Sequence, residues 1–161
     1  MFKPDEDGIY AIVQASQGRR LFGYGVLFSL GAILIYTTLA YPPAVHWMIF
    51  MLAFGVSMLW LAEKLRRATK LTIILTADEL RDSRGVLLAK LSDVQSVERG
   101  AFALKPSNGF TLVMKSKSSR AWAPGIWWRM GHRVGVGGVT AAGQSRFMAE
   151  QIALRLAALG S

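Results

Sequence analysis

Two long runs without charge constrain the fold of this chain more than any other feature. Residues 21–41 contain no charged side chain, and residues 44–62 contain only His46 as a titratable group. A helix rises about 1.5 Å per residue, so each run is long enough to cross a hydrocarbon core of roughly 30 Å. The alternative is a pair of buried helices, but a chain of 161 residues offers too little other protein to cover them. The sequence therefore predicts two transmembrane helices at residues 21–41 and 44–62.

The segment before the first run does not have the pattern of a secretory signal peptide. Residues 1–20 contain three acids at positions 5–7, and the apolar run that follows is longer than the roughly 7–15 residues of a signal peptide. A second apolar run follows at once. We therefore expect residues 1–20 to remain as an N-terminal segment of the mature protein.

Basic residues flank the pair of predicted helices only at its two ends. The connector between the helices contains no Lys or Arg. The basic residues at the ends are Arg19, Arg20, Lys64, Arg66, Arg67 and Lys70. Positively charged flanks favour the cytoplasmic side of a membrane. We expect both termini in the cytoplasm, with residues 63–70 as a basic link at the membrane surface.

Small residues four apart indicate where the two helices pack. Gly25 and Ser29 form such a pair in the first helix, and Ala53 and Ser57 form one in the second. Small side chains let helix backbones approach closely in a membrane, where burial of apolar surface no longer drives association. The sequence predicts that these four residues line the contact within the hairpin.

The remainder of the chain is strongly basic. From Lys64 onward it has 16 basic and six acidic residues, a net charge of +10. The chain has no cysteine, which excludes disulfides, thiolate metal sites and cysteine nucleophiles. Next to a membrane, anionic lipid headgroups are the nearest acidic surface for such a domain.

Short β-type segments indicate that residues 71–161 form an α+β domain. The expected strands are at residues 71–76, 86–91, 94–102 and 110–115. Short strands with turns between them are typical of an antiparallel β-sandwich or barrel. Thr140 can cap a helix that runs to about Leu159, and an amphipathic helix at 140–159 would close the open side of the strands.

The order of these parts resembles the bacterial membrane-anchored PH-like domain proteins. The likeness rests on residues 71–80 (LTIILTADEL), residues 85–98 (GVLLAKLSDVQSVE) and the closing helix. Photosynthetic-complex assembly proteins of some bacteria are similar in plan. The resemblance implies a PH-like fold, a location in the bacterial inner membrane and a non-catalytic role, but it names no ligand.

The stretch at residues 123–138 (APGIWWRMGHRVGVGG) lies outside that general pattern. Its glycines match neither a dinucleotide fingerprint nor a P-loop. Aromatic and basic residues together can stack on and bind nucleic acid. The predicted tethering to a membrane and the lack of an RNA-binding motif argue against that function. We interpret the glycines as features of a twisted or bulged last strand that turns tightly into the closing helix.

The tryptophans of this region need a separate explanation. Adjacent residues of a strand point to opposite faces, so one of two neighbouring indoles would face outward. Aromatic residues and Arg are the usual anchors of protein interfaces. The candidate partner-binding residues are Trp122, Trp127, Trp128, Arg129 and Arg133.

Nothing in the sequence indicates catalysis, a cofactor or a metal site. The two histidines have no carboxylate at ligand spacing, and no serine lies in a nucleophile elbow. We expect a non-enzymatic binding module that acts as an accessory subunit or assembly factor of a larger, energy-transducing membrane complex. The alternative is a sensor or scaffold that binds anionic lipid headgroups. No nucleic-acid or small-molecule partner is expected.

Overall fold

A computed structural model describes residues 7–99 and 107–159 of the chain. The structure divides into two compact units. One unit is the helical hairpin Gln17–Arg67, and the other combines Met1–Ser16 with Ala68–Ser161. Of the predicted N-terminal segment 1–20, the described residues 7–16 therefore belong to the sheet domain, and residues 17–20 belong to α1.

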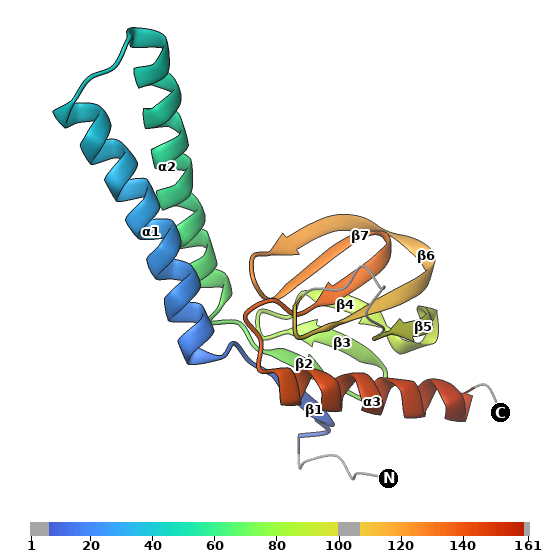
Figure 1. Cartoon of the computed structure of the whole chain (residues 1–161). Coiled ribbons are helices and arrows are strands. Elements are labelled where there is room, and N and C mark those ends of the chain that lie inside the picture. The colour runs from blue at the N-terminus through green and yellow to red at the C-terminus, as the bar shows by residue number, and fades with distance from the viewer. Residues whose placement is uncertain (1–6, 100–106, 160–161) are drawn as a thin grey trace. The chain divides into compact units, whose positions relative to one another are not determined.

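The helical unit consists of two helices that are both long and apolar enough to cross a membrane. They are α1 (Gln17–Ala40) and α2 (Val45–Ala68), each of 24 residues (Figure 1). A helix of this length spans about 36 Å. Helix α2 continues through most of the predicted basic link. Its last turns contain Glu63, which forms ion pairs with Arg66 at 2.7 Å and with Arg67 at 2.6 Å.

The two helices approach each other at a pair of glycines that the sequence analysis did not select. A Cβ atom added to Gly31 would lie 2.9 Å from the carbonyl oxygen of Gly55. A Cβ atom added to Gly55 would lie 2.8 Å from Cγ1 of Ile35. The predicted packing residues were wrong. Ser29, Ala53 and Ser57 are exposed, and Gly25 has no atom within 4 Å of an added Cβ. Spacing identified small residues but not the helix face on which they lie.

The first sheet of the domain includes a strand from the N-terminal segment. Its four antiparallel strands follow the chain order β1 (Ala11–Val13), β2 (Ile73–Leu75), β3 (Glu79–Asp82) and β4 (Leu87–Lys90). Strand β1 is only three residues long and pairs with β2 through Ala11 and Leu75. So short a strand has no visible alternation in the sequence, which is why residues 1–20 read as a separate segment.

The second sheet is built around one long hairpin. A short 3-10 helix, η1 (Leu91–Asp93), leads into three antiparallel strands in chain order: β5 (Val94–Glu98), β6 (Phe110–Ala123) and β7 (Trp127–Val136). Strand β5 ends at Glu98, before the predicted end at residue 102, and residues 100–102 lie outside the described residues. Strand β6 is far longer than the predicted residues 110–115.

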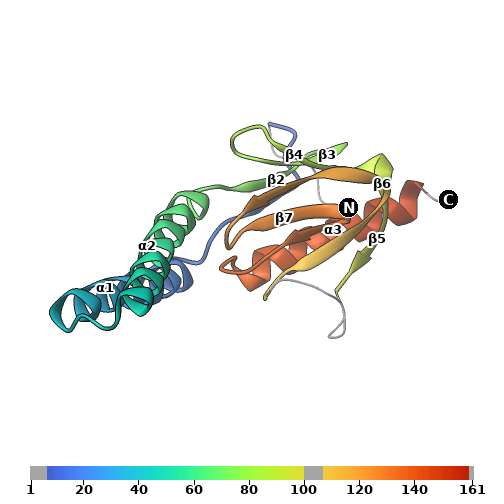
Figure 2. The same ribbon diagram turned by 90° about the horizontal axis from the view of Figure 1, so that it is seen from above.

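A C-terminal helix packs against both sheets. Helix α3 (Ala142–Leu159) contacts β1, β5 and β6 and begins two residues after Thr140. Its Met148 and Ile152 are fully buried. The guanidinium of Arg155 lies 3.4 Å from the ring centre of Tyr10. Figure 2 shows α3 along the sheets of the domain.

The two sheets and α3 enclose one hydrophobic core. Its fully buried large side chains include Ile73, Leu80, Leu88, Phe110, Leu112, Val134 and Ile152. The strands form two separate sheets and no closed barrel among the described residues. The α+β class is thus confirmed at this level: a pair of apolar helices, two antiparallel sheets and a C-terminal helix.

Candidate functional site

The β6–β7 hairpin curls back until its turn meets the end of its own second strand. The amide of Gly137 donates to the carbonyl of Ile126 at 2.8 Å, and the amide of Val139 donates to the carbonyl of Gly125 at 2.9 Å. The long curved hairpin is visible in Figure 1. The turn at residues 124–126 is therefore fixed to the domain by backbone hydrogen bonds.

Glycines allow this close approach. Gly138 has a φ of +121°, and a Cβ atom there would lie 2.8 Å from the carbonyl oxygen of Gly125. At Gly135 an added Cβ would overlap the indole ring of Trp128, which covers that position. Both contacts need a residue without a side chain. The glycines therefore have a structural role in the hairpin, as the sequence interpretation proposed.

The structure gives the three tryptophans of the hairpin different surroundings. Trp127 is only 2% exposed and belongs to the hydrophobic core. Its indole Nε1 has no hydrogen-bond partner within the described part of the chain. Trp122 is 50% exposed, and its cross-strand neighbour Trp128 is half-buried. Of the three, Trp122 offers the most surface to a partner, whereas Trp127 offers almost none.

The two predicted arginines of the hairpin are engaged within the domain. Arg129 donates from Nε and Nη2 to the carbonyl and hydroxyl of Ser119, at 2.9 and 3.0 Å, and from Nη1 to the carbonyl of Leu87. Arg133 forms an ion pair with Glu98 at 3.3 Å. Arg129 therefore braces the hairpin against β4. Spacing along the sequence gave no sign of this contact, because Leu87 lies 42 positions away.

Strand β6 contributes exposed basic residues that the sequence analysis did not select. Lys115, Lys117 and Arg120 are exposed, and the ammonium of Lys115 donates to the carbonyl of Ser92 at 2.9 Å. The recurrence of basic residues in KSKSSR was the available signal. It was missed because the strand was predicted to end at residue 115.

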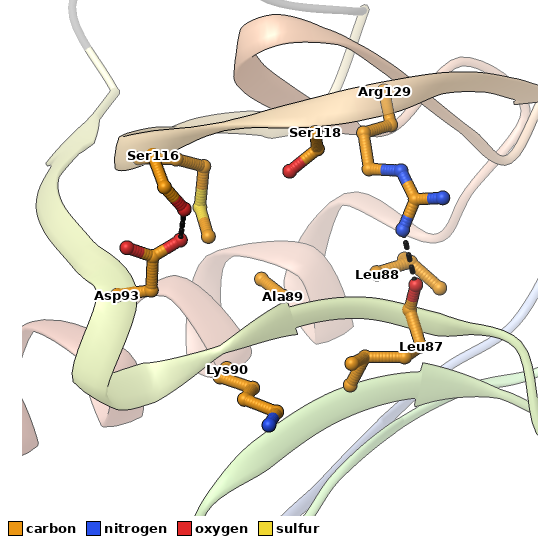
Figure 3. Close-up of a pocket in the computed structure, with 9 residues that line it drawn as sticks. Leu87, Leu88, Ala89, Lys90, Asp93, Ser116, Ser118 and Arg129 are labelled. Atoms are coloured by element: carbon orange, nitrogen blue, oxygen red, sulfur yellow. Dashed lines mark hydrogen bonds between the residues drawn. The ribbon is translucent and has the colours of Figure 1, made fainter.

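A pocket of about 260 Å³ lies between β4 and β6. Its lining comprises Leu87, Leu88, Ala89, Lys90, Asp93, Met114, Ser116, Ser118 and Arg129. Figure 3 shows β4 on one side of this space and β6 on the other, with Arg129 reaching Leu87 at one end. At the other end the hydroxyl of Ser116 donates to the carboxylate of Asp93. The pocket is a gap between two strands, bridged at both ends by side chains.

The predicted membrane-surface cations have diverse contacts. Arg66 and Arg67 share the carboxylate of Glu63, and the ammonium of Lys64 lies 4.6 Å from the ring centre of Trp60. Lys70, which the sequence analysis grouped with them, is exposed and belongs to the sheet domain, whereas Arg19 and Arg20 lie at the start of α1.

The described residues contain no group of three or more His, Asp or Glu side chains that could hold a metal ion. The ring Nδ1 of His132 lies 3.3 Å from the carbonyl oxygen of Met114, within hydrogen-bond distance. Comparisons with known proteins found no matching family, no matching curated protein and no matching solved structure.

Proposed function

We propose that this chain is a non-catalytic, membrane-anchored binding module. In this proposal α1 and α2 cross the bacterial inner membrane with both termini in the cytoplasm. The sheet domain has a PH-like fold, as the sequence resemblance implies. The domain binds a larger, energy-transducing membrane complex. The chain serves that complex as an accessory subunit or assembly factor. Two apolar helices and a basic domain with an exposed aromatic residue support this proposal.

The observation that carries the proposal is an exposed apolar patch on the β6–β7 hairpin. Trp122 is 50% exposed and Met130 is 52% exposed. Trp122 stands opposite Trp128, and Met130 follows Trp128 by two residues, so strand alternation places all three on one face. Arg120 is exposed and precedes Trp122 by two residues, within the register shift between Ser118 and Ala121. We call these four residues the hairpin face. Aromatic residues, Met and Arg are the residue types enriched at protein interfaces.

A pair of substitutions tests the hairpin face. Trp122→Ala removes an exposed indole, so the domain should fold normally while the co-purifying membrane complex is reduced at least tenfold. Truncation of an interface anchor typically costs about 2 kcal/mol or more of binding. Leu154→Ala is the matched control, because Leu154 is 64% exposed but lies on α3. Equal recovery of the same proteins with both variants would contradict the proposed binding face.

The second candidate function is binding of anionic lipid headgroups. It is favoured by the three exposed basic residues of β6: Lys115, Lys117 and Arg120. The full chain can be placed in nanodiscs of zwitterionic or anionic lipid and followed by hydrogen exchange of β6. Electrostatic attraction is screened over about 8 Å at physiological salt. Protection seen only with anionic lipid, and lost at high salt, would favour this function. Identical exchange in both lipids would exclude it.

The orientation follows from the basic flanks and has its own test. Because the chain lacks cysteine, single cysteines at Ala44 and Ser119 can be labelled selectively. A membrane-impermeant thiol reagent should reach position 44 from outside intact cells and should not reach position 119. Labelling at position 119 alone would reverse the orientation.

A further inference from the structure

The gap between β4 and β6 is bordered by two strand edges that lack a neighbouring strand. Among the described strands, β4 is the last of its sheet and pairs only with β3. Strand β5 pairs with β6 no further than Met114. Beyond that point, β6 pairs only with β7 among the described strands, and this pairing is irregular between Val113 and Ala121, where Ser118 stands opposite Gly131 with a register shift on either side. We call the space between β4 and residues 115–119 the strand gap.

Backbone groups at such an edge are ready to pair with another chain, and proteins usually cover or block them. Here the guanidinium of Arg129 reaches the carbonyl oxygens of Leu87 in β4 and Ser119 in β6. Arg129 thus links one carbonyl of β4 to one carbonyl of β6 across the strand gap.

The strand gap also has a defined chemical character. Its apolar part consists of Leu88, Ala89 and Met114, which line the pocket and belong to the core. Two cations, Lys90 and Arg129, line the same pocket, and the acid of its lining, Asp93, accepts a hydrogen bond from Ser116. An extended peptide alternates its side chains between two faces. A segment that alternates apolar with acidic residues could therefore place apolar side chains over the core and carboxylates near Lys90 and Arg129.

We propose that the strand gap accepts an extended segment of a partner protein with alternating apolar and acidic residues, which adds a strand beside β4. The segment takes the hydrogen-bond positions that Arg129 fills in the free protein. Strand addition of this kind obtains affinity from backbone hydrogen bonds and specificity from alternate side chains. The inference rests on the proposed binding role and names the class of partner segment.

The test uses the full chain in zwitterionic nanodiscs and a labelled seven-residue peptide of alternating Glu and Val. We expect saturable binding and new hydrogen-exchange protection in residues 87–90 and 115–119. A second peptide carries N-methyl groups on alternate residues, which removes the donors along one edge. It should bind at least tenfold more weakly. Absence of saturable binding, or equal affinity for both peptides, would overturn the proposal.

Two variants separate the gap from the rest of the surface. Ser118→Trp fills the gap and should abolish peptide binding. Ser96→Trp is its control, because Ser96 is exposed on β5 and does not line the pocket. Lys90→Glu should weaken binding about tenfold through charge reversal. If Ser118→Trp binds the peptide as well as the unchanged chain does, the site is elsewhere.

The same variants distinguish this inference from the proposed function. If the membrane complex co-purifies equally with the Ser118→Trp and Ser96→Trp variants, the strand gap is not where that complex binds, although the binding role stands. If no complex co-purifies with the unchanged chain, the proposed function fails, whatever the peptide result.

Discussion

The helical hairpin and the β6–β7 hairpin use glycine for the same purpose but differ in where their apolar side chains lie. In the first, Gly31 and Gly55 let two helix backbones meet while large apolar side chains such as Phe22 and Phe50 remain exposed. In the second, Gly135 lets the Trp128 indole lie against the strand, and the neighbouring Val134 and Val136 are fully buried. Large apolar side chains are mostly exposed in the helical hairpin and mostly buried in the β6–β7 hairpin, where Trp122 and Met130 are exceptions.

This contrast separates two sources of stability. A sheet domain in water is stabilised by removing apolar side chains from solvent. Helices in lipid gain little from that effect, because the surrounding chains are as apolar as the side chains, so close packing of backbones matters more. We therefore expect substitutions in the strand hairpin to cost more than comparable substitutions in the helical hairpin. Three predictions test this difference, in order of decreasing effect.

The largest effect is expected at Trp127. Replacing this buried indole with alanine should cost about 3–5 kcal/mol of folding free energy, because it leaves a cavity in the core. Hydrogen exchange of the Val134 and Val136 amides in the full chain would measure the loss. Trp127→Phe should cost less, since the ring is largely kept and the indole N–H has no partner in the described residues. Unchanged exchange in the alanine variant would show that Trp127 does not hold the core together.

How well the sequence predicted these differences depends on how far apart in the chain the interacting residues lie. Strand alternation required neighbouring indoles to face opposite ways, and the lengths of the two apolar runs indicated two helices. Neither rule shows which residue meets which across the chain. Arg129 contacts Leu87, which is 42 positions away, and β1 pairs with a strand about 60 positions later. Such contacts follow from the path of the backbone, which local patterns do not specify.

The same limit explains the error in the helical hairpin. Gly25, Ser29, Ala53 and Ser57 have the correct spacing, but spacing fixes only that the members of a pair share a face. Which face meets the other helix depends on how each helix is rotated, and the Gly31–Gly55 contact shows that rotation. In the candidate site, the exposed Trp122 was selected, whereas the long β6 edge was missed because its serines and lysines do not alternate with apolar residues.

An intermediate effect is expected at Gly135. A Cβ atom at this position would overlap the Trp128 indole, so Gly135→Ala should cost about 1–3 kcal/mol through overpacking. Hydrogen exchange of the same strand amides reports the change. In a Trp128→Ala background the indole is gone, and the added methyl group should cost much less. An equal cost in both backgrounds would show that the penalty comes from the backbone and not from the indole.

The smallest effect is expected in the helical hairpin, where Gly31→Ile tests whether backbone approach stabilises the helix pair. The added side chain would meet the carbonyl oxygen of Gly55 and the side chain of Leu59, each at about 3 Å from the new Cβ. We expect a loss of about 1–2 kcal/mol, because the helices must move apart. Unfolding of the full chain by SDS in mixed micelles, followed by far-ultraviolet circular dichroism, measures it. Gly25→Ile is the matched control on the same helix, since no atom lies within 4 Å of a Cβ there. Equal loss in the two variants would mean that the penalty arises from a β-branched residue in α1, and the Gly31–Gly55 contact would then contribute little to the hairpin.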